Sequence, residues 1–164
     1  MFPDDIHALA ATVIRLAIAR DLQVATAESC TGGLVTGALT GVAGSSAVVD
    51  RGFVTYSNAA KTDLLAVPSA LIEAYGAVSE PVARAMASGA LSRSAAAVSV
   101  AVTGVAGPGG GTADKPVGLV HFAAAGPNGL VHAERRFGEI GREAVRLESV
   151  RVALGLLIER LQAG

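Results

Sequence analysis

The spacing of apolar residues along the chain predicts helices that are separated by short strands. Apolar residues at i, i+3 and i+4 indicate one buried face of a helix, whereas a short apolar run rich in β-branched residues indicates a strand. Helices are predicted at 4–20, 32–40, 58–65, 69–76, 79–93 and 142–161. Strands are predicted at 22–27, 47–57, 97–102, 117–124 and 130–137.

Residues that begin or interrupt regular structure mark the ends of these elements. Asp4 or Asp5 can cap the first helix, and Asn58 is predicted as the N-cap of the third. Pro81 stands close to the first position of a further helix, where its missing N–H is harmless. The segment 126–129, Gly-Pro-Asn-Gly, predicts a hairpin between the last two strands.

The order of these elements predicts how the chain folds and where a ligand binds. Helices that alternate with apolar strands favour a three-layer α/β domain, and the hairpin makes its sheet mixed. A length of 164 residues suits one substantial core, so residues 1–164 are expected to form a single domain. In open α/β sheets, ligands bind beyond the carboxyl ends of the strands. We expect the loops that follow strands at Ser29, Asn58 and Thr103 to converge there.

The composition of the chain indicates its cellular location and the kinds of partner it can bind. No segment reaches the ~20 apolar residues of a membrane span, and the acidic start lacks the basic region of a secretory signal. The net charge of −1 argues against a nucleic-acid partner, and the single cysteine excludes an intrachain disulfide and a cysteine-rich metal site. We therefore expect a cytoplasmic protein. Charged residues make up 16%, against ~25% in typical soluble domains, which favours a homo-oligomer unless alanine alone raises the apolar fraction.

The stretch 26–33, Thr-Ala-Glu-Ser-Cys-Thr-Gly-Gly, joins a predicted strand to a predicted helix. First-turn N–H groups of a helix have no partner within it and attract negative charge, and glycines let a ligand approach closely. Ser29 places a hydroxyl beside these donors, which is the geometry of acyl transfer. Taken alone, the stretch is more typical of ordinary helix capping than of catalysis. Glu28 either orients Lys61 or a substrate group, or ends the strand as a solvated acid.

Lys61 is the candidate base for Ser29. It lies in the first turn of a predicted helix, where the helix dipole and any burial lower the pKa of an amine and favour its neutral form. A neutral amine can accept a proton. The alternative interpretation is a solvent-exposed lysine.

Two other kinds of residue compete for these roles. Cys30 is an alternative nucleophile, because a thiolate at a helix N-terminus is reactive. The other interpretation of Cys30 is a small buried apolar residue. His7, His121 and His132 are all predicted within helices or strands, so none lies in a loop beside Ser29. A serine–histidine–aspartate arrangement therefore has little support.

Two further segments offer groups for an anion. The segment 103–112 is too glycine-rich for regular structure and matches neither common phosphate fingerprint, yet its N–H groups suit a flat or anionic ligand unless it is a flexible connector. Lys115 stands at its far end. Arg142 and Arg146, four residues apart, share a helix face that suits phosphate or carboxylate, unless they are solvated beside neighbouring glutamates.

Six ordered stretches carry a resemblance to a known family. They are 27–33 (AESCTGG), 44–46 (GSS), 54–61 (VTYSNAAK), 76–80 (GAVSE), 101–111 (AVTGVAGPGGG) and 115–118 (KPVG). Together they resemble the C-terminal domain of the competence/damage-inducible CinA proteins, over roughly residues 5–160. That family includes stand-alone nicotinamide-nucleotide amidases.

The resemblance implies a fold and an activity. It implies hydrolysis of the carboxamide of nicotinamide mononucleotide to nicotinate mononucleotide and ammonia, with the nucleophile at Ser29, its lysine partner at Lys61, no metal and no cofactor. The implied fold is a three-layer α/β/α sandwich with a mixed, mostly parallel sheet, in a homodimer. The family's late Gly-Asp-Arg segment falls on Gly141-Arg142, which lacks the Asp. The predicted oxyanion and substrate contacts are Cys30, Thr31, Gly32, Gly33, Tyr56, Asn58, Thr103, Gly104, Gly107 and Arg142.

Two rival functions remain beside the amidase. One is a non-catalytic nucleotide-binding module linked to competence or DNA damage, which binds ligand but releases no ammonia. The other is a thiol hydrolase that uses Cys30 in place of Ser29.

Overall fold

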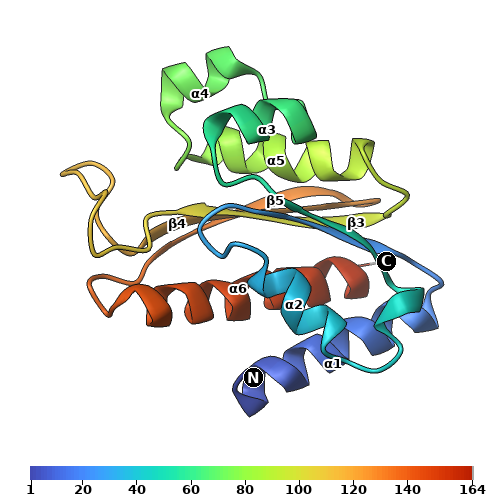
Figure 1. Cartoon of the computed structure of the whole chain (residues 1–164). Coiled ribbons are helices and arrows are strands. Elements are labelled where there is room, and N and C mark those ends of the chain that lie inside the picture. Colours follow the sequence, from blue (N-terminus) through green and yellow to red (C-terminus); the bar gives the residue numbers. More distant parts are fainter. Residues whose placement is uncertain (164) are drawn as a thin grey trace.

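A five-stranded sheet lies between two layers of helices in the computed structural model, which describes residues 1–163 (Figure 1). Gly164, the last residue of the predicted domain, lies outside the described residues. The strands are β1 (Val24–Glu28), β2 (Val49–Val54), β3 (Val98–Gly104), β4 (Leu119–Gly126) and β5 (Gly129–Arg136). The helices are α1 (Asp4–Ala19), α2 (Leu34–Thr40), α3 (Asn58–Leu65), α4 (Ser69–Tyr75), α5 (Glu80–Ser92) and α6 (Arg142–Gln162), and a 3₁₀ turn, η1, spans Ser45–Ala47.

The sheet has the strand order β2-β1-β3-β4-β5. β1 pairs in parallel with both β2 and β3, whereas β4 is antiparallel to β3 and β5, so β4 alone runs against the other strands. β4 and β5 form the predicted hairpin, in which Gly126 pairs with Gly129. The predicted α/β/α sandwich with a mixed, mostly parallel sheet is confirmed.

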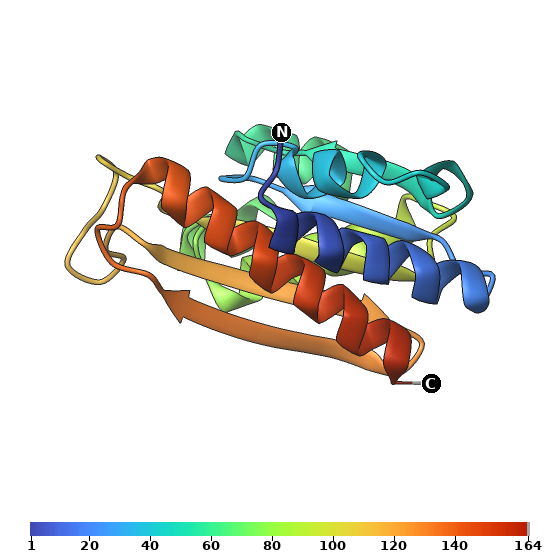
Figure 2. The ribbon, with the colours of Figure 1, turned by 90° about the horizontal axis from the view of Figure 1, so that it is seen from below.

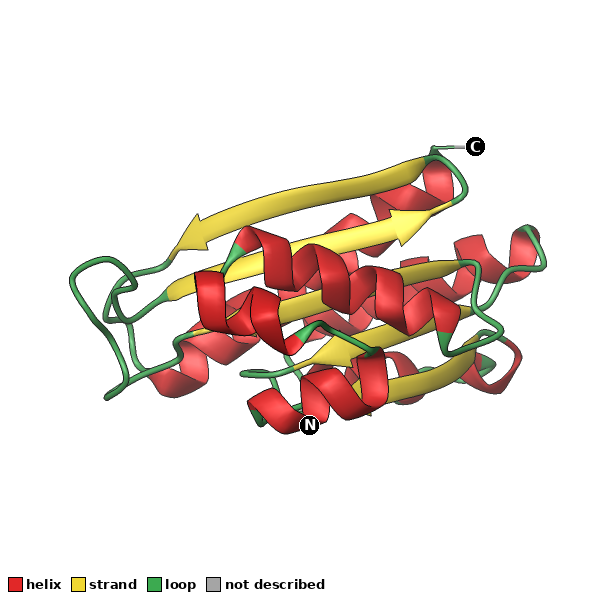
Figure 3. Ribbon diagram, turned by 90° about the horizontal axis from the view of Figure 1, so that it is seen from above, coloured by secondary structure: helices red, strands yellow, loops and turns green. Residues whose placement is uncertain are grey.

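The two faces of the sheet carry side chains of different size. Helices α1, α2 and α6 cover one face of the sheet, and α3, α4 and α5 cover the other (Figures 1 and 3). Larger side chains of the strands pack toward the first layer, and alanines pack toward the second. The larger set includes Val24, Val98, Val100, Val102 and Phe122. The alanine set is Ala25, Ala27, Ala101, Ala123 and Ala125. Because alanine projects so little, the α5 layer can approach the sheet closely, while α1 and α6 lie side by side over the bulkier face (Figure 2).

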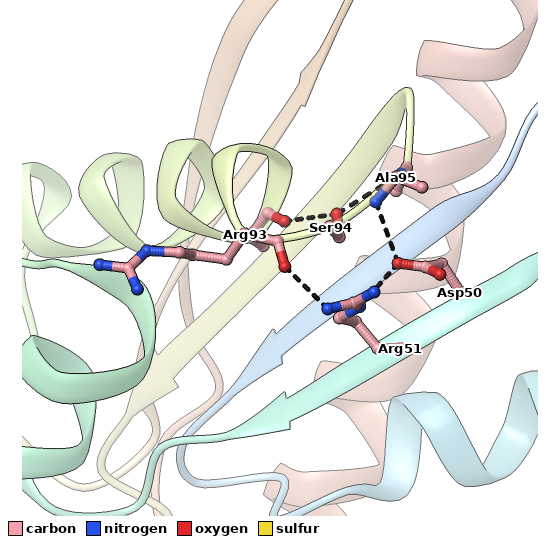
Figure 4. A network of polar contacts seen from close by, with 7 residues as sticks. Asp50, Arg51, Arg93, Ser94 and Ala95 are labelled. Atoms are coloured by element: carbon pink, nitrogen blue, oxygen red, sulfur yellow. Dashed lines mark hydrogen bonds and ion pairs between the residues drawn. The ribbon is translucent and has the colours of Figure 1, made fainter.

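A polar network fastens the edge strand β2 at the end of the sheet opposite the carboxyl ends (Figure 4). The carboxylate of Asp50 accepts hydrogen bonds from Arg51 Nε at 2.7 Å and from the N–H of Ala95 at 3.1 Å, and Arg51 Nη1 donates to the carbonyl of Arg93 at 3.0 Å. The Arg51 and Ala95 donors lower the pKa of Asp50. The network ties β2 to the segment between α5 and β3.

Several predicted element ends differ from the structure. Pro3, rather than an aspartate, occupies the N-cap of α1, and Asp5 instead pairs with Arg151 on α6 at 2.5 Å. Ser57 caps α3 through a hydrogen bond from the N–H of Ala60 at 3.0 Å, so the predicted cap, Asn58, is the first helical residue. The predicted strand 47–57 is shorter, because η1 precedes β2 and the chain leaves the sheet after Val54. Within residues 1–163, no helix combines the length and the apolar character that crossing a membrane requires.

A pair of histidines joins β4 to β5 beneath α5. His121 Nδ1 lies 2.9 Å from His132 Nε2, and the ring centres are 5.2 Å apart. The distance between the ring centres is about the N···N distance plus the radius of each ring, so the two nitrogens lie on the line that joins the rings. The two nitrogens therefore share one proton along the line between the rings. The other ring nitrogen of His132 lies 3.6 Å from the Glu80 carboxylate, and burial lowers the pKa of both histidines.

The free energy of unfolding is expected to fall as the pH drops below about 6.5, the usual histidine pKa. Below that pH the unfolded chain binds protons that the folded pair resists, so the free energy of unfolding decreases as the pH falls from neutral through the usual histidine pKa. Charges from Glu80, Arg84 and Glu134 and from Lys115 also face the pair. Urea unfolding across this range measures the slope.

The matched variants for this prediction are His132→Gln and His7→Gln. Removing His132 takes away the shared proton and is expected to flatten most of the slope. His7 is exposed on α1, so its replacement is expected to leave the slope in place. Equal slopes in all three proteins would contradict the role of the pair.

Candidate active site

The structure brings Ser29 and Lys61 together. Ser29 follows β1 directly, and Lys61 lies in the first turn of α3, which follows β2. The Lys61 amine donates to Ser29 Oγ at 3.0 Å and to the carbonyl of Thr55 at 2.8 Å. Because β1 and β2 are parallel neighbours, their carboxyl ends place the two side chains at the same edge of the sheet.

The surroundings of Lys61 favour an uncharged amine. The side chain is only 1% exposed, and within residues 1–163 it forms no ion pair. Burial lowers the pKa of Lys61, because a charged amine loses its hydration there. A buried lysine that points at a serine hydroxyl has the chemistry of a general base.

Glu28 occupies the N-terminus of α2 that the sequence suggested for a ligand. Its carboxylate accepts hydrogen bonds from the N–H groups of Gly33 at 3.1 Å, Val35 at 3.0 Å and Thr36 at 2.8 Å, and from the Thr36 hydroxyl at 3.0 Å. Glu28 is fully buried, so it is neither a solvated acid nor a partner of Lys61. The protein's own carboxylate thus takes the place of a bound anion.

A cavity of about 320 Å³ opens over Ser29 at the carboxyl end of the sheet. Its wall contains most of the residues that the sequence predicts for the site, namely Ser29, Cys30, Tyr56, Asn58, Lys61, Thr103, Gly104, Gly107 and Arg142. Thr31, Gly32 and Gly33 lie outside it. The sequence analysis did not single out Ala77, Val78, Val105, Ala106, Gly109 and Gly110, which also line the cavity. Val105, Ala106, Gly109 and Gly110 fall within the glycine-rich segment 103–112, whereas the only sequence signal for Ala77 and Val78 is the family-like stretch 76–80.

The two arginines of α6 have different roles. Arg142 lies at the cavity wall, where its guanidinium donates to the carbonyl of Gly107 at 2.8 Å and to the hydroxyl of Tyr56 at 2.9 Å. Arg146 lies outside the cavity and donates to the carbonyls of Cys30 and Thr31, each at 3.1 Å. Arg142 therefore faces the cavity, whereas Arg146 holds the turn that carries Ser29.

Thr103 and Lys115 each donate a hydrogen bond to a backbone carbonyl near the cavity. The hydroxyl of Thr103 is buried and donates to the carbonyl of Ala77 at 2.8 Å, which fixes the segment between α4 and α5 against β3. Lys115 does not line the cavity; its amine donates to the carbonyl of Tyr75 at the end of α4. The proposed anion-binding role of Lys115 has no support from this position.

The environment of Cys30 disfavours a thiol nucleophile. Cys30 is 6% exposed, and burial raises the pKa of its thiol to about 12. A reactive cysteine needs the opposite environment, one that stabilises the thiolate. His121 and His132 bind one another and do not line the cavity, so the nearest basic group to Ser29 is Lys61.

The fold and the site define a class of domain: an α/β/α sandwich with a serine and a buried lysine at the carboxyl ends of its parallel strands. The chain matches the family described as CinA C-terminal domain over residues 6–161, and it belongs to that family.

Relatives and solved structures agree with this assignment. A CinA-like protein from Synechococcus sp. (strain RCC307) is 54% identical over 162 residues, which are 98% of this chain and 38% of the relative. One from Anaeromyxobacter dehalogenans (strain 2CP-C) is 56% identical over 146 residues, 88% of this chain and 35% of the relative. The chain thus spans less than two-fifths of the length of these relatives.

Among solved structures, the competence/damage inducible protein CihA from Agrobacterium tumefaciens has a TM-score of 0.96 at 57% identity, covering 99% of this chain and 98% of that one. A CinA superfamily protein from Escherichia coli has a TM-score of 0.90 at 38% identity, covering 97% of this chain and 93% of that one.

Proposed function

We propose that this chain is an amidase that converts nicotinamide mononucleotide to nicotinate mononucleotide and ammonia through an acyl-enzyme on Ser29. One observation carries the proposal: a buried lysine amine, with a lowered pKa and no ion-pair partner in residues 1–163, lies 3.0 Å from a serine hydroxyl in an open cavity. The choice of substrate rests on the resemblance of the chain to a family that includes stand-alone nicotinamide-nucleotide amidases. We further propose that the protein acts in the cytoplasm, because its single cysteine excludes an intrachain disulfide, and that it forms a homodimer, because few of its residues are charged.

The chemistry needs one base that also serves as an acid. Lys61 accepts the hydroxyl proton while Ser29 Oγ bonds to the carboxamide carbon and the C=O electron pair moves onto oxygen. The Lys61 ammonium then protonates the nitrogen, the C–N bond breaks, and ammonia leaves. Water attacks the remaining ester, Lys61 takes a proton from the water, and Ser29 leaves with that proton. The reaction requires neutral Lys61 at its start, so kcat/KM is expected to rise with pH through its lowered pKa.

The cavity also suits the phosphate of a nucleotide. The guanidinium of Arg142 is not ion-paired within residues 1–163, and no aspartate or glutamate lines the cavity wall. Ala106, Gly107 and Gly110 line the same wall, and their N–H groups have no acceptor among the described residues. A guanidinium beside a set of free backbone N–H groups is a common arrangement for binding phosphate.

An assay of released ammonia tests the proposal. Purified protein incubated with nicotinamide mononucleotide is expected to release one ammonia for each nicotinate mononucleotide formed, and Ser29→Ala is expected to stop the release. Cys30→Ala is expected to retain most of the activity, whereas a thiol hydrolase would show the reverse pattern. Tight nucleotide binding without ammonia would instead favour the non-catalytic binding module.

A further inference from the structure

The backbone hydrogen bonds of the turn after β1 identify which of its donors are free. The N–H of Ser29 donates to the carbonyl of Val102 at 2.9 Å, and the N–H of Gly32 donates to the carbonyl of Ser29 at 3.0 Å. The N–H of Gly33 donates to Glu28 at 3.1 Å. Of the N–H groups from residue 29 to residue 34, only those of Cys30 and Thr31 have no acceptor among residues 1–163.

Peptide geometry gives the direction of the Cys30 N–H. In a trans peptide the N–H points opposite to the preceding carbonyl. The carbonyl of Ser29 is turned into the turn, where it accepts the N–H of Gly32, so the N–H of Cys30 points out of the turn. Cys30 lines the cavity beside Ser29 Oγ, whereas Thr31 is fully buried and does not line it.

Two opposite charges hold the turn in this geometry. Glu28 accepts hydrogen bonds from three N–H groups at the start of α2, and Arg146 on α6 donates to the carbonyls of Cys30 and Thr31. Gly52, which pairs with Thr26 on the neighbouring strand, leaves room for this cluster, because a Cβ there would lie 2.2 Å from the Thr36 hydroxyl. Within residues 29–34, the N–H groups left without an acceptor are that of Cys30, which lines the cavity, and that of Thr31, which is buried together with its unpartnered hydroxyl.

We propose that the Cys30 N–H is the donor that binds the developing oxyanion, and that Glu28 and Arg146 are positioning residues that keep it free and aimed at the cavity. The inference rests on the proposed serine chemistry, but not on the choice of substrate. The residue after a serine nucleophile commonly supplies such a donor, because its N–H lies beside the attacking oxygen. Loss of one oxyanion donor typically lowers kcat by about 10²–10³-fold.

A single NMR signal can observe this donor directly. Cys30 is the only cysteine, so ¹⁵N-cysteine labelling gives one backbone amide resonance. The probe is pyridine-3-boronic acid, which accepts the Ser29 oxygen on boron while the hydroxyl proton passes to Lys61, leaving a tetrahedral, negatively charged boronate. The Cys30 amide proton is expected to move downfield on binding, and Ser29→Ala is expected to abolish the change.

Variants of Arg146 test the positioning role. Arg146→Met is expected to lower kcat by about 100-fold with KM within about threefold, because a small displacement of a catalytic group affects the transition state most. It is also expected to weaken boronate binding, and Arg146→Lys to recover part of both losses. Arg151→Met is the matched control, since Arg151 lies on the same helix but pairs with Asp5 and Glu148.

The outcomes separate this inference from the proposed function. A boronate adduct on Ser29 with an unmoved Cys30 amide would overturn the inference even if ammonia is released. A downfield shift without turnover of nicotinamide mononucleotide would support the inference and reject the substrate. If Arg146→Met lowers only the melting temperature, with kcat and boronate affinity unchanged, its role is structural and the positioning claim fails.

Discussion

Replacement of Lys61 by methionine is expected to lower the rate of ammonia release from nicotinamide mononucleotide by about 10⁴-fold. Methionine matches the length of the lysine stem but cannot accept the Ser29 proton. Without a base, the hydroxyl attacks only as a neutral alcohol, and the leaving nitrogen receives no proton. The rate of ammonia formation, measured at saturating substrate, gives the loss in kcat.

The fold is expected to tolerate this change. Two effects on the free energy of unfolding oppose each other, each of about 1–3 kcal/mol. Removing the buried amine relieves the cost of desolvating it, whereas the carbonyl of Thr55 loses the donor that now lies at 2.8 Å. We therefore expect the melting temperature to move by only a few degrees, as measured by differential scanning calorimetry.

Two further variants make the result specific to a proton acceptor. Lys61→Arg introduces a permanently charged guanidinium that cannot lose its proton at ordinary pH. This variant is therefore expected to be as inactive as the methionine variant. Lys115→Met replaces the chain's other lysine, which lies outside the cavity, and is expected to retain activity. Substantial turnover by Lys61→Arg would show that the charge, rather than the free electron pair, matters.

The meeting of Ser29 and Lys61 could be predicted because it follows from topology. Ser29 lies just after β1 and Lys61 lies in the first turn of the helix that follows β2, and parallel strands bring their carboxyl ends to one edge of the sheet. The position of Thr103 follows from the same rule, since β3 is the other parallel neighbour of β1. Predictions of this kind need only the order of the elements and the identity of the first residues after each strand.

The roles of Glu28 and Arg146 could not be predicted in this way. Whether Glu28 faces α2 or the cavity depends on the path of the turn, and two glycines with positive φ, Gly32 at +57° and Gly33 at +101°, fold the chain back over the carboxylate. Arg142 and Arg146 share a helix face, but the angle at which α6 crosses the sheet decides which of them reaches the cavity. These outcomes depend on tertiary packing, to which local sequence gives no guide.

The close packing of α5 on α3 predicts a second large effect, on stability. Gly89 is buried on α5, and a Cβ there would lie 2.1 Å from the backbone carbonyl oxygen of Leu65. Gly89→Ala is therefore expected to lower the free energy of unfolding by about 3 kcal/mol, because backbone cannot rotate away as a side chain can. For a chain of this size the melting temperature falls by about 10 °C.

Gly155 on α6 provides the matched control. It is also a helix glycine, but a Cβ there would meet no atom within 4 Å. Gly155→Ala is expected to raise the free energy of unfolding by about 0.5–1 kcal/mol, since alanine has the higher helix propensity. Calorimetry on the two variants thus compares one chemical change in two environments, with opposite signs expected.

The Gly89 variant also connects packing to the site. Lys61 lies one turn before Leu65 on α3, so a methyl group that pushes α3 away from α5 also draws the Lys61 amine away from Ser29. We expect the folded fraction of Gly89→Ala to release ammonia at least about 10-fold more slowly than the parent, because the proton transfer needs contact distance. If folded Gly89→Ala retained full activity, α3 could shift without separating Lys61 from Ser29. The packing of α3 against α5 would then not be what fixes the distance between these two side chains.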